Sequence, residues 1–147
     1  MKELKSTAEA LKVELESLPV QSPKGFDNVF DTITQQHLDG LIVFADPLTF
    51  SNSEIIVKFA NSSHRPALYA AQEFVDAGGL MSYGPSYPNM FHRGAHFVDR
   101  ILKGTKPADL PVEQPMQFDF VINLKTAKQI GLTIPPNVLA RADRVIK

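Results

Sequence analysis

Apolar residues recur along this chain with two alternating periods. One period is three to four residues, as on the buried face of a helix, and the other is two residues or a continuous run, as in a strand. The helical period predicts helices over residues 2–11, 26–33, 52–60, 72–77, 87–103 and 124–130, and a short last helix that contains Val138, Leu139 and Val145. The strand patterns predict strands over residues 13–17, 40–45, 67–70, 80–83 and 118–122. Strands and helices that alternate with short loops are typical of an α/β fold built on a parallel sheet.

Capping and turn residues support these boundaries. Ser51 and Glu54 have the spacing of a capping box at the start of the third helix. Gly78 suits the left-handed conformation that ends a helix, and Asn123 suits the N-cap of the helix that follows it. The continuous apolar run 40–45 predicts a parallel strand that is covered on both faces.

Composition limits the class of protein. The 147 residues are about one globular domain, with 44% hydrophobic and 21% charged residues. A net charge of −1 lacks the basic excess that nucleic acid requires, and the absence of cysteine excludes disulfides.

The opening segment MKELKSTAEALKVELESL breaks every apolar run with polar residues, so it does not have the pattern of a signal peptide. No run reaches the roughly 18 apolar residues of a membrane span. The chain as given is therefore expected to stay in the cytoplasm.

Three phrases in the second half carry a family resemblance. They are EFVDAGGLMSYGP at 73–85, ILKGTKPADLPVEQP at 101–115 and FVINLKTAKQIGLTIPP at 120–136. In this order they closely resemble the carboxy-terminal half of bacterial ABC-transporter substrate-binding proteins, the group that includes tryptophan and tyrosine uptake receptors. They lie within residues 73–136, a little under half of the chain, and the first half fits the preceding part of the same fold more loosely.

The resemblance implies a type I periplasmic-binding-protein fold, in which two α/β lobes face each other across a cleft that binds a solute. On that plan residues 1–84 form most of the second lobe without its first strand. Residues 85–147 form the crossover and return segment, including a crossover helix, a strand and short helices, which packs on a first lobe that precedes this chain. Strand 13–17 then pairs with strand 40–45 or leaves a gap in the sheet.

The same resemblance implies a function. It predicts a truncated or partial solute-binding component of an uptake transporter, extracytoplasmic in the full-length protein, with a membrane permease as partner and no catalysis or cofactor. The solute is expected to be small and polar, such as an amino acid.

Candidate ligand-binding residues follow from a general rule of open α/β sheets, in which ligands lie beyond the carboxyl ends of the strands. Residues at those ends carry carboxylates for an ammonium group and aromatic rings for stacking. The residues selected in this way are Asp46, Pro47, Gln72, Glu73, Tyr83, Gly84 and Tyr87.

Each candidate also has a structural interpretation. Asp46 and Ser51 are equally suited to capping a loop and a helix, and Glu73 suits the solvated first turn of a short helix. Tyr83 and Tyr87 are equally suited to packing between lobes. These alternatives stay open at the level of sequence.

Metal and catalytic motifs are weak. His92 and His96 have the i, i+4 spacing of metal ligands, but position 93 is Arg rather than the Glu of a hydrolytic zinc site, so we expect no metal. Ser82 is one residue out of register with a nucleophile elbow.

Two alternative functions remain beside the solute-binding hypothesis. One is a small α/β enzyme that uses Asp46 or Glu73 as acid–base. The other is a truncated product that binds no solute and only self-associates. Self-association, as a homodimer, is expected through the apolar faces of helix 87–103 and strand 118–122.

Overall fold

The computed structural model describes residues 2–147 and divides into two compact units, one up to residue 36 and one over residues 37–147. The first unit contains helices α1 (Lys2–Leu11) and α2 (Gly25–Gln35), as the helical period predicts. In α2, Phe26 and Ile33 are buried, and the rings of Phe26 and Phe30 lie 5.9 Å apart between centroids.

The predicted strand over residues 13–17 is wrong. That segment has no regular secondary structure, and the side chain of Val13 is 57% exposed. A two-residue alternation forms a strand only where another strand accepts its hydrogen bonds. Of the two expected outcomes for this segment, pairing with 40–45 or a gap in the sheet, the pairing is not found among the described residues, where β1 pairs with β2 alone.

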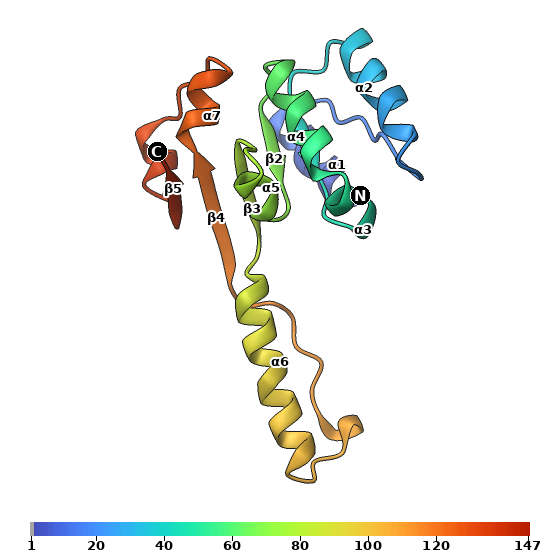
Figure 1. Cartoon of the computed structure of the whole chain (residues 1–147), viewed down its shortest axis with the longest axis vertical. Coiled ribbons are helices and arrows are strands. Elements are labelled where there is room, and N and C mark those ends of the chain that lie inside the picture. Colours follow the sequence, from blue (N-terminus) through green and yellow to red (C-terminus); the bar gives the residue numbers. More distant parts are fainter. Residues whose placement is uncertain (1) are drawn as a thin grey trace. The chain divides into compact units, whose positions relative to one another are not determined.

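A five-stranded sheet forms the centre of the second unit (Figure 1). Its strands are β1 (Leu41–Val43), β2 (Ala67–Tyr69), β3 (Met81–Pro85), β4 (Phe118–Asn123) and β5 (Arg144–Ile146), in this spatial order. Strands β1, β2 and β3 are parallel, β4 runs antiparallel to β3, and β5 is parallel to β4. The helices of this unit are α3 (Pro47–Ser51), α4 (Ser53–Ser62), α5 (Glu73–Asp76), α6 (Tyr87–Leu102), α7 (Leu124–Gln129) and α8 (Pro136–Leu139), with a 3₁₀ turn η1 (Pro107–Asp109). The predicted α/β class is therefore confirmed.

Two local predictions need correction. The capping box lies at Asp46 and Thr49, whose side chains and backbone N–H groups bond each other reciprocally at 2.9 Å, while Ser51 is the last residue of α3. Val145 lies in β5 rather than in the last helix, because its strand pairs with β4. By contrast, Asn123 caps α7 as predicted, accepting from the backbone N–H groups of the next turn, and Gly78 has the expected positive φ of 100°.

Strand β1 lies at the edge of the sheet rather than inside it. Ile42 is 50% exposed and Phe44 is 55% exposed, so the prediction that run 40–45 is covered on both faces is wrong within the described residues. An unbroken apolar run predicts a buried strand only when a neighbour covers each side of it.

The core lies around β2, β3 and β4. Phe74 is fully buried and stacks on Tyr69, with 5.0 Å between ring centroids and 8° between ring planes. A second cluster contains Leu80 and Ile122, both almost fully buried, with residues of α7 and the loop after it. Part of the chain after Gly104 belongs to this core as well, because β4 lies between β3 and β5 and contributes the buried Val121 and Ile122.

The expected division at residues 84 and 85 stays a prediction about a two-lobed protein. In this chain, residues from both sides of that boundary join one sheet, since β3 and β4 pair along five residues each.

Hydrogen exchange is expected to be slower in β4 than in β1. The amides of Val121 and Ile122 lie in a strand with neighbours on both sides, whereas Ile42 lies in an edge strand. Exchange follows the free energy of local opening, which is largest in buried, doubly paired strands. Amide exchange followed by NMR or mass spectrometry checks this expectation. Equal protection, or faster exchange in β4, would contradict the sheet order.

Candidate functional site

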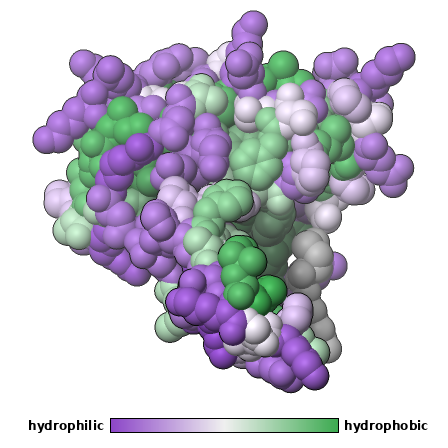
Figure 2. All heavy atoms as spheres, turned by 60° about the horizontal axis from the view of Figure 1, so that its bottom comes forward, coloured by the Kyte–Doolittle hydropathy of each residue, from purple (hydrophilic) through white to green (hydrophobic). Residues whose placement is uncertain are grey.

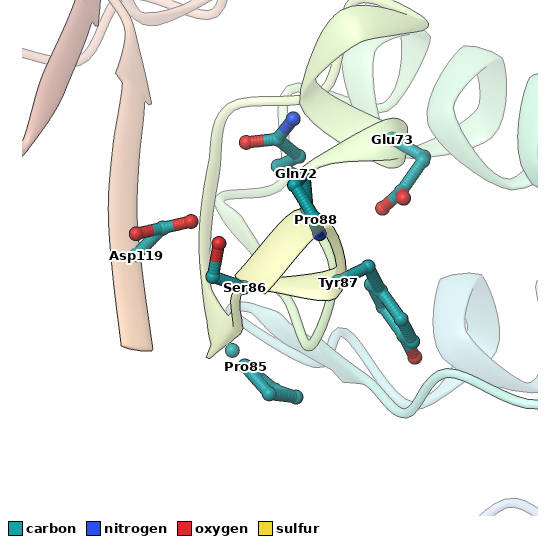
Figure 3. A pocket seen from close by; sticks show the side chains of 8 residues that line it. Gln72, Glu73, Pro85, Ser86, Tyr87, Pro88 and Asp119 are labelled. Carbon is teal, nitrogen blue, oxygen red and sulfur yellow. The ribbon is translucent and has the colours of Figure 1, made fainter. Parts of the chain in front are cut away.

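A shallow hollow lies where β3 ends and α6 begins (Figure 3). Its volume is about 220 Å³, including the part open to solvent. It is lined by Gln72, Glu73, Gly84, Pro85, Ser86, Tyr87, Pro88 and Asp119. The lining comes from the loop before α5, the carboxyl end of β3, the first turn of α6 and the start of β4.

The antiparallel pairing of β3 with β4 sets the floor of the hollow. Gly84 is the register partner of Asp119, so a residue without a side chain lies beside a carboxylate. A Cβ atom at position 84 would overlap the carbonyl group of Ala70, because the backbone after β2 crosses directly over Gly84. Glycine is therefore required for this close approach. Asp119 Oδ1 also accepts a bond of 3.4 Å from Gln117 Nε2.

The first turn of α6 forms a second side of the hollow. Ser86 is 6% exposed, and its backbone N–H donates to the carbonyl oxygen of Gln117 at 3.0 Å. Its Oγ accepts from Asn89 Nδ2 at 3.1 Å. Proline at position 88 lies in the first turn of the helix, where its missing N–H costs no hydrogen bond.

An aromatic contact supports Tyr87. Its ring meets the ring of Phe50 edge to face, with 6.2 Å between centroids, and Phe50 in turn lies 5.5 Å from Phe74. Phe50 belongs to α3, whose N-cap is Asp46. Asp46 therefore caps the helix whose Phe50 contacts Tyr87.

The structure brings together four of the sequence-predicted residues: Gln72, Glu73, Gly84 and Tyr87 all line the hollow. Asp46 and Pro47 do not line it, because they begin α3, and Asp46 caps that helix. Tyr83 lies outside it too. Its ring, 57% exposed, stacks on Phe118 at 5.6 Å. The ligand-binding role of all seven residues stays a proposal.

Sequence reasoning missed Pro85, Ser86, Pro88 and Asp119. The first three directly follow the chosen end of β3, so extending the choice by a few residues would have found them. Asp119 lies at the start of its own strand, and only the antiparallel register brings it beside the end of β3. No sequence signal gives that register.

The hollow offers acceptors and an aromatic ring but no cation. Glu73 and Asp119 are its charged lining residues, and none of the lining residues is basic. This arrangement favours a ligand with a positively charged group. Deeper in the core, burial raises the pKa of the Tyr69 phenol, so Tyr69 stays neutral at physiological pH.

Two searches of the described residues bear on other kinds of site. Among them, no group of three His, Cys, Asp or Glu side chains is placed to hold a metal ion. No helix in the described part of the chain has the length and hydropathy needed to cross a membrane.

Known proteins resemble this chain over nearly its whole length. A family model described as ABC transporter substrate binding protein matches residues 1–146. A tyrosine-binding protein of Clostridioides difficile strain R20291 is 26% identical over 95 residues, which are 65% of this chain and 28% of that protein.

Solved structures show the same fold. A conserved domain protein from Vibrio cholerae aligns with a TM-score of 0.88 at 30% identity, over 99% of this chain and 49% of that chain. An ABC domain in complex with L-Trp from Streptococcus pneumoniae aligns with a TM-score of 0.87 at 31% identity, over 99% of this chain and 50% of that chain. This chain thus spans about half the length of these solved relatives. The predicted periplasmic-binding-protein-like fold is confirmed, and the chain belongs to the family of ABC transporter substrate-binding proteins.

Proposed function

We propose that this chain is a solute-binding component, or part of one, of an ABC-type uptake transporter, and that an amino acid binds in the hollow at the end of β3. The observation that carries this proposal is the pairing of Gly84 with Asp119, which lays a carboxylate beside a floor without side chains. The names of two relatives, a tyrosine-binding protein and a domain in complex with L-Trp, support an amino acid as the solute.

Different lining residues are expected to bind different parts of such a solute. Asp119 and Glu73 accept hydrogen bonds from its ammonium group, and charge-assisted bonds of this kind are stronger than neutral ones. The ring of Tyr87, supported by Phe50, offers an aromatic surface for an apolar or aromatic side chain. This role involves binding alone, in keeping with a family of substrate-binding proteins rather than enzymes.

The transport role implies further partners. In the full-length protein the solute-binding component works outside the cytoplasm and delivers its solute to a membrane permease. We also propose that the protein forms a homodimer.

An NMR titration with L-Trp tests the proposed site. In ¹⁵N-labelled protein, L-Trp at millimolar concentration is expected to shift the amide signals of Glu73, Gly84, Ser86 and Asp119. Indole-3-propionate, which lacks the ammonium group, is expected to leave them in place. Shifts that are equal for both compounds, or that fall elsewhere in the chain, would contradict the proposal.

A pair of variants tests the role of the carboxylate. Asp119→Asn is expected to weaken L-Trp binding by at least about 5-fold, because it removes a charge-assisted hydrogen bond that contributes about 1 kcal/mol or more. Asp109→Asn is the matched control, since Asp109 lies in η1 and does not line the hollow. Equal loss in both variants would show that net charge, rather than position 119, controls binding.

A further inference from the structure

The α5 segment, residues 72–79, carries two lining residues of the hollow at its start, Gln72 and Glu73. Its backbone is hydrogen-bonded through the helix. The Asp76 N–H donates to the carbonyl oxygen of Gln72 and the Ala77 N–H donates to that of Glu73, each at 3.0 Å. The segment therefore moves as one piece, and a contact that fixes its far end also helps to fix where Gln72 and Glu73 lie in the hollow.

Two side chains from distant elements donate to one carbonyl oxygen at the far end of this segment. Asn61 Nδ2, on α4, donates to the Gly78 carbonyl oxygen at 3.0 Å. Thr126 Oγ1, on α7, donates to the same oxygen at 2.8 Å. A carbonyl oxygen has two lone pairs, so the two donors use its full capacity. These bonds join α4, the α5 segment and α7 at one point, the Gly78 junction, which consists of Asn61, Gly78 and Thr126.

Thr126 is buried in a way that makes this bond important. Many polar side chains of the protein lie at its surface, as Figure 2 shows for one face, but Thr126 is only 4% exposed. A buried hydroxyl without a hydrogen-bond partner destabilises a protein more than a paired one stabilises it. Asn123 caps α7 by accepting from the backbone N–H of Thr126 at 3.3 Å. The capped helix therefore holds the Thr126 hydroxyl against the Gly78 carbonyl group.

Apolar packing holds the middle of the α5 segment, where Phe74 and Val75 are almost fully buried. Such packing has no preferred direction, so it fixes the depth of the segment in the core rather than its rotation. Hydrogen bonds are directional, and the two at the Gly78 junction fix the rotation as well. The ion pair between Asp76 and Arg144 adds less, because both side chains are about half exposed to water.

We propose that the Gly78 junction positions Gln72 and Glu73 for solute binding, with Asn61 and Thr126 as positioning residues. Neither of these two residues lines the hollow, so each acts through the α5 segment. The role in binding rests on the proposed function of the hollow, whereas the restraint on the α5 segment is a property of the solute-free protein. All of these residues belong to the second compact unit.

Hydrogen exchange of the solute-free protein tests the restraint. Thr126→Val keeps the shape of the side chain and removes the donor, so we expect the Ala77 amide to exchange about fivefold faster or more. Thr126→Ser keeps the donor and is expected to stay within about twofold of the unchanged protein. Ile134→Val is the matched control for stability, because Ile134 belongs to the core cluster around Leu80, which contains no residue of the α5 segment. Equal acceleration at Ala77 in Thr126→Val and Ile134→Val, or none in Thr126→Val, would overturn the proposal.

Titration with L-Trp, followed through the Asp119 amide signal, tests the consequence for binding. Thr126→Val is expected to weaken binding by about threefold or more, and Ile134→Val by less than about twofold. In a background of Gln72→Ala and Glu73→Ala the effect of Thr126→Val is expected to disappear, because the side chains through which it acts are gone. A loss that persists in that background, or unchanged binding in Thr126→Val, would overturn the positioning role. If the unchanged protein bound no L-Trp, the proposed function and the role in binding would both be wrong, and hydrogen exchange would still decide whether the junction restrains the α5 segment.

Discussion

Replacing Gly84 with alanine is expected to destabilise the protein by about 3–5 kcal/mol, at the severe end of single substitutions. The new methyl group would occupy the position of the Ala70 carbonyl group, which is backbone and has no rotamer to change. The chain after β2 would have to move away from β3, and the stacked pair of Tyr69 and Phe74 would move with it. The same movement would open the hollow, so solute binding is expected to disappear together with stability.

Urea unfolding followed by circular dichroism measures this loss. Gly94→Ala is the control, because a Cβ atom there meets nothing within 4 Å. Gly94 lies inside α6, so alanine is expected to stabilise the helix by up to about 1 kcal/mol. If Gly84→Ala unfolded at the same urea concentration as the unchanged protein, the close crossing of the chain over Gly84 would be wrong.

Much of the secondary structure follows from local sequence. Helix α6 is predicted almost to the residue, because its apolar stripe gives its length and Gly104 gives its end. The N-cap at Asn123 is also predicted, since its side chain bonds backbone groups two and three residues away. These features depend on neighbours in the sequence.

The wrong predictions are those that depend on contacts with residues distant in the sequence. Residues 13–17 alternate like a strand, but pairing requires a partner that local pattern does not supply. Run 40–45 has the composition of a central strand, yet β1 is at the edge of the sheet. The sequence suits Asp46 equally to capping and to ligand binding, and its bond to the backbone of Thr49 shows that it caps α3.

Some residues of the candidate site can likewise be predicted from local sequence, and others cannot. Glu73 and Tyr87 follow from the rule that ligands bind at the carboxyl ends of parallel strands. Asp119 does not, because β4 runs the other way and brings the start of a strand to that edge. The order and direction of strands are long-range properties, and they decide which charged side chain completes the hollow.

The other large expected effect concerns affinity. A binding cleft commonly encloses 70–90% of a small ligand. The hollow here is shallow and open to solvent, so it encloses a smaller share. With about half of the contacts available, a solute bound at about −8 kcal/mol by a full cleft would be bound at about −4 kcal/mol, which is near millimolar instead of micromolar. Water that reaches Glu73 and Asp119 weakens their attraction for an ammonium group further.

We therefore expect L-Trp to bind this chain with a dissociation constant of about 1 mM or weaker. At 5 mM L-Trp this constant corresponds to about 1 kcal/mol of added stability, and so to a rise in melting temperature of roughly 2–4 °C. Calorimetry and thermal unfolding measure the two quantities independently, with indole-3-propionate as the control that lacks the ammonium group. Because this chain spans about half of the solved relatives, a full-length relative should bind far more tightly in the same assay. Sub-micromolar binding of L-Trp by this chain would mean that its own residues enclose the solute, and the open hollow at Gly84 and Asp119 would then be the wrong site.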